Sequence, residues 1–576
     1  MATKPQFTTL PTGECVDFGA DVQAHPWLKV YPKAVPWDLE VKPSLLGDLL
    51  DRSVAAHGPR PCTYFMGRRL SYAEIGALAD RAAKGLRELG VGEGVRVGLC
   101  MPNTPAFVIF YYGVLKAGGT VVNFNPLYSL EEIEFQVRDS GAKIMVTLDL
   151  DLTHGKIATL LGRGVLEKAV VASFTAMLPP LKAVGFKLTQ RDKLAPAAKS
   201  GATNKVVLAR ELLANDGRFE PPSITPEAIA VLQYTGGTTG TPKGAMLTHA
   251  NLSINVAQVE AWQNAIAKAG DRIVGVLPLF HVFAMTAVMN FGLSHGLEII
   301  LLPKFDLIPT LKLIGKLKPV MMPGVPTLFN AILRHPHIAN FDLSSLKYCI
   351  AGGAPLPLEI KRGFEAISGA TLVEGYGLSE TSPVVACNPP EAPRQGSIGL
   401  PLPATEISIR SLDDPNVVMK QGETGEICVA GPQVMLGYWN KPEETEGSFV
   451  GRFFRTGDVG YMDEDGYIFI VDRIKDMINA SGFKVYPRRI EDALYEHPAV
   501  AEAIVIGIPD AYRGEAPKAY VKLKEGKQAS PEELIHFLKE KLSKLEIPAE
   551  IEFRDDLPKT LVGKLSRREL RAEAKR

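Results

Sequence analysis

Short runs of β-branched and other apolar residues alternate with amphipathic helical patterns over most of the chain. Residues 95–99 and 120–123 are strand-like, and residues 104–117 between them have the apolar spacing of a helix. Alternation of this kind is typical of α/β layers with parallel strands. We therefore expect an α/β fold whose large N-terminal part stacks sheets and helices in several subdomains.

Residues 273–297 contain no Asp, Glu, Lys or Arg, over more than the roughly 20 residues that a membrane-spanning helix needs. Pro278 and the glycines Gly275, Gly292 and Gly296 interrupt this stretch. We therefore expect a buried strand and helix at the centre of a large α/β domain, rather than a transmembrane helix.

The alternation weakens over residues 153–222, where apolar residues are mixed with basic ones. The basic residues in the middle of this segment are Lys182, Lys187, Arg191, Lys193, Lys199 and Lys205. They suit either a solvated surface excursion or a basic, partly apolar patch that rests on an anionic membrane surface. The surface excursion is favoured, because Pro179, Pro180 and Pro196 prevent one continuous amphipathic helix.

A domain boundary is expected where the strand-like sequence YIFIVDR ends, near Asp472. Beyond it, residues 487–497 have a helical pattern and residues 500–508 are strand-like. The segment after the boundary therefore has its own strands and helices, as a small domain does. We divide the chain into an N-terminal extension (1–43), a large domain (44–472), a hinge (473–476) and a small, mobile C-terminal α+β cap domain (477–576).

The composition is that of a folded protein without a charge bias. Of 576 residues, 46% are hydrophobic, and 64 Lys and Arg balance 64 Asp and Glu. This neutrality argues against broad nucleic-acid binding, which needs a basic face. Six cysteines lie scattered without a C-x-x-C pair, and the N-terminus has no apolar signal segment. Both features favour a reduced, cytoplasmic location.

A loop rich in glycine and threonine, YTGGTTGTPKG at residues 234–244, follows the apolar run AIAVLQ. Its glycines let the backbone approach an anion, its threonines offer hydroxyl donors, and Lys243 adds a positive charge. These properties suit a polyphosphate. A Walker A loop has Gly directly before the lysine and Ser or Thr directly after it. Pro242 and Gly244 occupy these places here, which disfavours a P-loop NTPase.

In this loop the chain resembles the adenylate-forming (AMP-binding) superfamily, which includes acyl-CoA and aryl-CoA synthetases. Seven further stretches match that superfamily's motifs in order: LPLFHVFA (277–284), AGGAPL (351–356), EGYGLSET (374–381), GEICVAGPQVMLGYWN (425–440), RTGDVG (455–460), DRIKDMINASGFKVYPRRIE (472–491) and PKTLVGKLSRREL (558–570). The resemblance covers nearly all of the chain from Ser44 onward. Within the superfamily the sequence looks most like bacterial long-chain fatty-acyl-CoA synthetases.

The resemblance implies roles in nucleotide chemistry. Lys564 would bridge the substrate carboxylate and the α-phosphate, where negative charge develops. Lys243, Glu380 and His281 would also be catalytic, and Thr235 and Glu380 match positions that hold Mg²⁺. The nucleotide, as ATP or AMP, would be bound by Thr235, Gly236, Gly237, Thr238, Thr239, Gly240, Lys243, Gly353, Ala354, Pro355, Glu374, Gly375, Tyr376, Gly377, Thr381, Asp458, Arg473 and Lys564.

It also implies sites for the acid and the thiol. The acyl site would be lined by Val282, Phe283, Gly324, Val325, Gly352 and Gly377. The thiol must later reach the carbonyl that Lys564 first contacts, so the small domain would rotate about a hinge at Lys475. The CoA channel would then be lined by His281, Ser481, Gly482, Phe483 and Lys484.

The expected activity is that of an AMP-forming acid–thiol ligase. A fatty acid, most simply a long-chain one, and ATP would give acyl-AMP and pyrophosphate, and CoA would then give acyl-CoA and AMP. Two alternatives stay open: a ligase for medium-chain, dicarboxylic or aryl acids, and a fatty-acyl-AMP ligase that delivers to a carrier protein. A catalytically inactive nucleotide-binding protein is disfavoured by Lys564, Glu380 and Asp458. A homodimer and peripheral contact with the inner membrane face are also left open.

Overall fold

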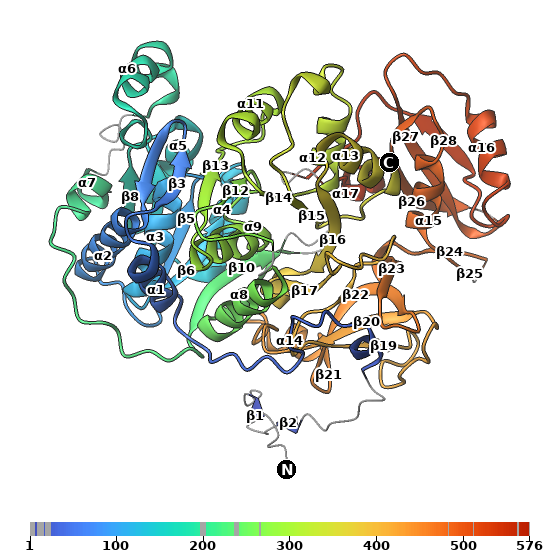
Figure 1. Ribbon diagram of the computed structural model, residues 1–576, viewed down its shortest axis with the longest axis horizontal. Helices are drawn as coiled ribbons and strands as arrows, with labels where there is room; N and C mark the ends of the chain where they lie inside the picture. The colour runs from blue at the N-terminus through green and yellow to red at the C-terminus, as the bar shows by residue number, and fades with distance from the viewer. Residues whose placement is uncertain are drawn as a thin grey trace.

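The structure is a computed structural model, and it describes residues 6–7, 16–17, 25–195, 203–235, 241–263, 266–481, 483–510, 512–560 and 564–574. A large N-terminal part and a small C-terminal domain make up the molecule, and the small domain lies at the right of Figure 1. Both parts combine helices and sheets, which confirms the predicted α/β fold class.

The first large sheet is made of strands from residues 96–208 and of the two strands that come directly before and after the threonine-rich loop. Within the described residues it has seven strands, all paired in parallel except β10 and β11 at one edge. Their order is β11 (Lys243–Thr248), β10 (Ile229–Thr235), β6 (Thr120–Phe124), β5 (Arg96–Cys100), β7 (Ile144–Leu148), β8 (Lys168–Ala172) and β9 (Val206–Leu208).

The second large sheet has nine strands in the described part of the chain, and its six central strands run parallel. The parallel strands are almost wholly buried, as expected for a sheet covered on both faces. The order is β18 (Leu400–Pro401), β17 (Val384–Cys387), β16 (Thr371–Gly377), β15 (Tyr348–Gly352), β14 (Met321–Gly324), β12 (Arg272–Gly275), β13 (Glu298–Leu301), β3 (Pro61–Phe65) and β4 (Arg68–Ser71).

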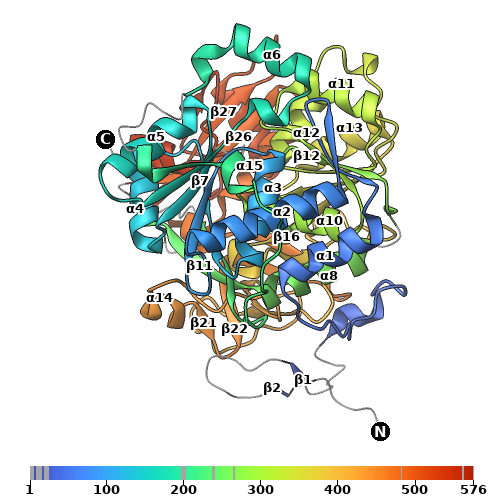
Figure 2. The same cartoon turned by 90° about the vertical axis from the view of Figure 1, so that its left-hand side faces the viewer.

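Three helices of the N-terminal part pack side by side, as Figure 2 shows. They are α1 (Leu46–His57), α2 (Tyr72–Glu88) and α3 (Pro105–Lys116). The sequence of α3 is apolar on all sides, and the helix is accordingly buried. Tyr72 on α2 donates a hydrogen bond to the Leu297 carbonyl oxygen (2.8 Å), which ties these helices to the second sheet.

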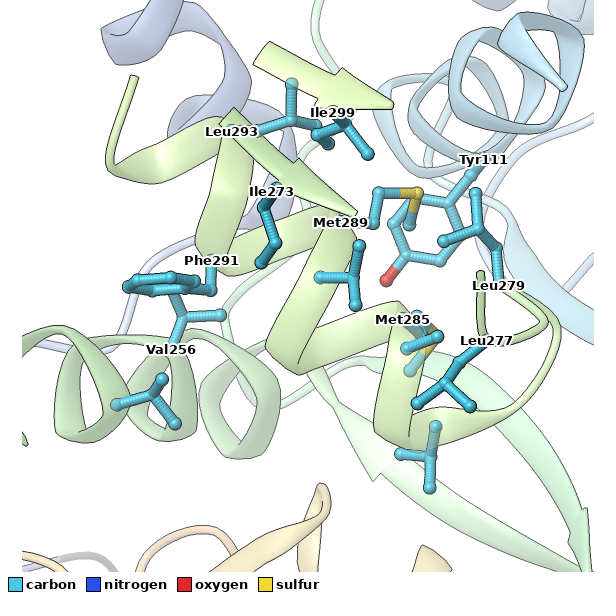
Figure 3. Packing of buried hydrophobic residues seen from close by; sticks show 14 of the residues in the cluster. Tyr111, Val256, Ile273, Leu277, Leu279, Met285, Met289, Phe291, Leu293 and Ile299 are labelled. Carbon is cyan, nitrogen blue, oxygen red and sulfur yellow. The ribbon is translucent and has the colours of Figure 1, made fainter. Parts of the chain in front are cut away.

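The charge-free stretch forms a strand and helices inside the large domain, as predicted. It runs from β12 through a loop into α9 (Val282–Ala284), a π-helix (Met285–Asn290) and α10 (Phe291–Ser294). Figure 3 shows Ile273, Met285 and Met289 among other buried side chains of this core. Of the helices that the structure describes, none is both long and apolar enough to cross a bilayer.

The basic segment contains regular structure that the sequence pattern does not reveal. Part of it forms the ten-residue helix α6 (Pro180–Thr189), with Pro180 at a position in the first turn that tolerates proline. Ala183 and Phe186 pack against the body of the protein, whereas Leu181, Val184 and Leu188 are 89%, 57% and 78% exposed. Spacings of three and four residues put these three side chains on one face of α6.

A third sheet precedes the small domain. Its described strands are β19 (Glu406–Arg410), β20 (Gly425–Ala430), β21 (Phe449–Val450), β22 (Phe453–Met462) and β23 (Ile468–Arg473). The short helix Ile474–Asp476 then leads into the small domain, which has a hydrophobic core of its own. That domain contains β24 (Ile478–Ala480), β25 (Phe483–Val485), α15 (Pro487–Tyr495), β26 (Val500–Asp510), β27 (Gly514–Leu523), α16 (Pro531–Lys539), β28 (Glu550–Phe553) and α17 (Arg567–Ala574).

Candidate active site

A cavity of about 590 Å³ is lined by residues of both domains. Its polar walls include Thr235, His281, Glu380, Glu426, Arg455, Thr456, Arg473, Lys475 and Lys564. Its apolar walls include Val259 and Trp262 of α8 (His249–Gln263), Val282, Phe283, Ala287, Ile350, Cys387 and Leu402. Charged groups beside an apolar wall suit a ligand with an anionic head and an apolar tail.

Lys564 comes from the small domain, yet its ammonium lies against the backbone of Gly353 in the large domain. A Cβ atom at Gly353 would lie 2.6 Å from Lys564 Nζ, and Gly353 has a φ of +78°. Glycine is therefore needed here both for the backbone conformation and for the space that the ammonium fills. Burial, and then the charge of Arg473, lowers the pKa of Lys564 to about 8. An anion in the cavity would relieve this cost of desolvation.

His281 lines the same cavity as a neutral imidazole. Burial, followed by the positive charge of Lys564, lowers the pKa of His281 to about 3. The backbone N–H of Phe283 donates to His281 Nδ1 (3.3 Å), which begins the helix that follows. Because Nδ1 accepts a hydrogen bond, this contact assigns the proton of the neutral ring to Nε2, which is left as a donor.

A buried carboxylate, Asp458 on β22, lies where the large domain ends. Tyr376 Oη donates to Asp458 Oδ2 (2.7 Å), and Arg473 Nε lies 3.0 Å from Asp458 Oδ1. Strand pairing places Asp458 directly opposite Arg473, which explains why two residues from separate motifs meet. A carboxylate held in this way is a fixed acceptor for a pair of hydroxyl groups.

Glu380, Tyr438 and Lys243 lie next to one another. Tyr438 Oη donates to Glu380 Oε1 (2.8 Å), and Lys243 Nζ lies 5.0 Å from the centroid of the Tyr438 ring. Thr235 Oγ1 donates to the Lys243 carbonyl oxygen (3.4 Å). Burial raises the pKa of Glu380, so its ionised form gains from a nearby cation.

Most described residues predicted for the nucleotide and the acid lie together, but several do not line this cavity. Val282, Phe283, Gly352, Gly353, Gly375, Tyr376 and Gly377 line it, whereas Lys243, Gly324, Val325, Ala354, Pro355, Glu374, Thr381 and Asp458 are not among its lining residues. The Thr381 hydroxyl donates to the Pro383 carbonyl oxygen (2.6 Å) and so serves the local turn. Gly324 faces the Phe329 ring. The predicted residues Gly236, Gly237, Thr238, Thr239, Gly240 and Gly482 lie outside the described part of the chain.

The residues predicted for the CoA channel are only partly assembled. Of these residues, His281 lines the cavity, as does Lys475, which is predicted as the hinge. Phe483 is 64% exposed, and Lys484 Nζ lies 3.3 Å from Asp413 Oδ1 instead. Ser481, in a positive-φ conformation at the end of β24, is exposed as well.

Several residues that line the cavity are not among those predicted from the sequence. Arg455 and Thr456 line the cavity and belong to the RTGDVG motif, so their place in that motif could have indicated that they lie at the site. Arg455 pairs with buried Glu426 (2.8 Å), which also lines the cavity. Trp262 carries no motif, and only its packing reveals it. A larger cavity of about 1110 Å³ lies elsewhere, next to α3 and α6, and none of the described predicted residues except the basic Lys187 and Arg191 line it.

This arrangement defines a class: a two-domain enzyme that activates an acid at a nucleotide site closed by a lysine of its C-terminal domain. Family models match residues 50–439 as an AMP-binding enzyme and residues 489–564 as an AMP-binding enzyme C-terminal domain. The chain therefore belongs to the AMP-binding enzyme family.

Similar proteins agree with this assignment. The chain is 44% identical to a long-chain-fatty-acid–CoA ligase of Bacillus subtilis, over 95% of this chain and 98% of that protein. It is 38% identical to a protein of the same name from Escherichia coli, with the same coverage. The structure of an anthranilate CoA ligase in complex with anthranoyl-AMP superposes with a TM-score of 0.80 at 26% identity, covering 94% of this chain and 99% of that one.

The lowered pKa of Lys564 predicts an alkaline limit to acid activation. The ammonium is the active form, so kcat/KM for ATP should decrease as pH rises through about 8, where the amine loses its proton. Lys564→Arg should move this limb to higher pH, because a guanidinium stays protonated. The measurement is the pH profile of ATP–pyrophosphate exchange, with Lys559→Arg as a matched control. An unchanged limb in Lys564→Arg would contradict the assignment.

Proposed function

We propose that this chain is an ATP-dependent fatty acid:CoA ligase. It joins a fatty acid, most simply a long-chain one, to AMP with release of pyrophosphate, and then transfers the acyl group to CoA with release of AMP. The observation that carries this proposal is the meeting of the Lys564 ammonium with an apolar wall in one cavity. The similarity to long-chain-fatty-acid–CoA ligases over 95% of the chain supports it.

In the first step two anions must approach each other, so positive charge is needed where they meet. Lys564 bridges the acid carboxylate and the α-phosphate, and Lys243 contacts the outer phosphates together with the threonine-rich loop. His281 Nε2 donates to the acid carboxylate. Asp458 accepts hydrogen bonds from the ribose hydroxyls, and Tyr376 stacks on the adenine.

The donor set beside the phosphates fits a divalent cation. Glu380 offers a carboxylate oxygen and Thr235 a hydroxyl, which are the hard ligands that Mg²⁺ takes together with substrate phosphates. Burial of Glu380 raises its pKa, a cost that a bound cation offsets. When bound, Mg²⁺ supplies charge neutralisation at the phosphate oxygens.

The second step needs a different face of the small domain, because Lys564 occupies the position through which a thiol would reach the carbonyl. We propose that the small domain rotates at residues 473–476, with Lys475 as the hinge, and that the segment 481–484 then lines the CoA channel. Lys475 lies in the short helix between β23 and β24, the segment that connects the two domains. The exposed positions of Phe483 and Lys484 are consistent with a channel that forms later. This rotation requires the predicted division of the chain into an N-terminal extension (1–43), a large domain (44–472) and a cap domain (477–576).

The acid specificity and the acceptor define the direct test of the function. The purified protein should release AMP when given ATP, CoA and saturated fatty acids, with the highest kcat/KM for long chains because the apolar wall binds their methylenes. Aryl acids, dicarboxylic acids and a carrier protein in place of CoA are the comparisons. A preference for aryl acids, or activity only with the carrier protein, would overturn the proposal.

Substitution of Lys564 separates the two half-reactions. Lys564→Ala should slow acyl-AMP formation by about a hundredfold to a thousandfold, because charge neutralisation in the transition state is lost. Conversion of supplied acyl-AMP and CoA to acyl-CoA should remain near the wild-type rate. Lys559→Ala is the matched control, since Lys559 pairs with Glu502 (2.9 Å) outside the cavity. Equal loss of both steps in Lys564→Ala would contradict the assigned role.

We also propose that the protein is cytoplasmic and touches the inner membrane face peripherally through α6. The exposed face formed by Leu181, Val184 and Leu188 supports this contact. Lys182, Lys187, Arg191 and Lys193 lie in this helix or directly after it, and their positive charge suits anionic lipid headgroups. A homodimer stays an open prediction.

The membrane contact predicts salt-dependent binding to vesicles. The protein should co-sediment with vesicles of anionic phospholipid, and Leu181→Asp with Leu188→Asp should weaken this binding at least about tenfold, since two exposed apolar side chains leave the interface. Val417→Asp with Val418→Asp is the matched control, because those two apolar side chains are 50% and 60% exposed in the loop between β19 and β20, away from α6 in the sequence. Equal binding by the α6 variant and the wild type would refute the contact.

A further inference from the structure

The cavity has a polar side and an apolar side, and strand β16 lies between them. Tyr376 reaches Asp458 on one face of β16. A Cβ atom at the neighbouring Gly375 would instead meet Ile350 (3.2 Å) and Cys387 (3.8 Å). Successive residues of a strand point to opposite faces, so the apolar side lies across β16 from the groups that face the nucleotide. An acyl chain would extend into this apolar side.

Trp262 of α8 is the largest side chain of the apolar side. Its indole is 4% exposed, and its Nε1 donates to the Asn388 carbonyl oxygen (3.4 Å), next to Cys387. Asn388 in turn donates from its amide to the Ser397 carbonyl oxygen (2.7 Å). The indole is therefore held at this end of the cavity by a chain of hydrogen bonds as well as by packing.

Residues of the N-terminal segment 25–43 cover the side of Trp262 that faces away from the cavity. The rings of Tyr31 and Trp262 meet edge to face with centroids 5.5 Å apart, and Tyr31 Oη donates to the Pro401 carbonyl oxygen (2.9 Å). Trp37 packs on Tyr31 (5.6 Å) and Trp27 on Trp37 (5.3 Å). The aromatic rings thus form a row that leads from the cavity wall through Tyr31 and Trp37 to the buried Trp27.

The N-terminal segment is tied to the large domain along its length. The Ala404 backbone N–H donates to the Trp37 carbonyl oxygen (3.0 Å). The Ser44 N–H donates to Ser253 Oγ (3.2 Å) on α8, the helix that carries Trp262. Trp27 is 1% exposed and belongs to the main core. The segment is therefore packed against the large domain and supports the wall of the cavity.

We propose that Trp262 is the end stop of the acyl site and that Tyr31 holds it in place, so that the N-terminal segment sets the longest acyl chain the enzyme accepts. The inference rests on the proposed fatty acid:CoA ligase activity and adds a specificity-determining pair to it. A chain that reaches the indole cannot extend further, because the Tyr31 and Trp37 rings fill the space behind.

The test compares ATP–pyrophosphate exchange driven by saturated acids of increasing length. In Trp262→Ala, kcat/KM for acids a few methylenes longer than the longest good wild-type substrate should rise at least about tenfold relative to that substrate. Tyr31→Ala should shift the same ratio in the same direction by a smaller factor. Tyr31→Phe, which keeps the ring and removes only the hydroxyl, should leave the ratio near that of the wild type. Trp262→Leu gives a second reading if the alanine variant does not fold.

The ratio of kcat/KM for the longer acid to kcat/KM for the shorter acid is taken within one variant. A general structural defect lowers exchange with all acids alike and leaves this ratio unchanged, whereas loss of the end stop raises it. A folded Trp262→Leu or Trp262→Ala variant with the wild-type ratio would overturn the end stop while leaving the ligase activity intact. Wild-type protein that exchanges pyrophosphate with no fatty acid would instead overturn the proposed function, and the end stop with it.

Discussion

Burial of one positive charge, the Lys564 ammonium, couples the two domains of this protein to its chemistry. The small domain carries Lys564 into a cavity of the large domain, where the missing side chain of Gly353 makes room for it. Desolvation lowers the pKa of this group to about 8, so the closed arrangement is costly without a negatively charged ligand. An arrangement of this kind gains stability when an anion binds in the cavity.

The other charges of the cavity follow the same physical rule. Burial raises the pKa of Glu380, so its ionised form would gain from a bound cation, and burial lowers the pKa of His281, which keeps the imidazole neutral. Asp458 is instead held by Tyr376 and Arg473 and is ready to accept hydroxyl groups. The zero net charge of the chain is thus an average over regions that differ in charge. The cavity contains both basic and acidic groups, and helix α6, at the periphery in Figure 1, is basic.

The apolar half of the site includes Val282 and Phe283 of the LPLFHVFA motif, but it also depends on parts of the chain that no motif identifies. Helix α8 supplies Trp262, the second sheet supplies Ile350 and Cys387, and the N-terminal segment supplies Tyr31 behind the wall. These residues all lie outside the stretches that resemble the superfamily's motifs, although Ile350 directly precedes one of them. Chemistry common to a family is concentrated in motifs, whereas the shape of a binding site is made by packing, which many residue combinations can provide.

The sequence by itself determined the α/β class, the buried nature of residues 273–297 and the small C-terminal domain, and its motifs predicted which residues carry nucleotide chemistry, because periodicity and short motifs are local properties of the chain. It did not reveal that α6 and β9 form within the weakly patterned segment, since tertiary contacts such as those of Phe186 stabilise them. Of the residues it predicted for the acyl site, Val282, Phe283, Gly352 and Gly377 line the cavity, and residues of α8 and β17 that it did not predict line the cavity with them. Only the tertiary structure decided which residues meet Lys564 and what lies behind Trp262, because such contacts join segments far apart in sequence and depend on how whole sheets and helices pack.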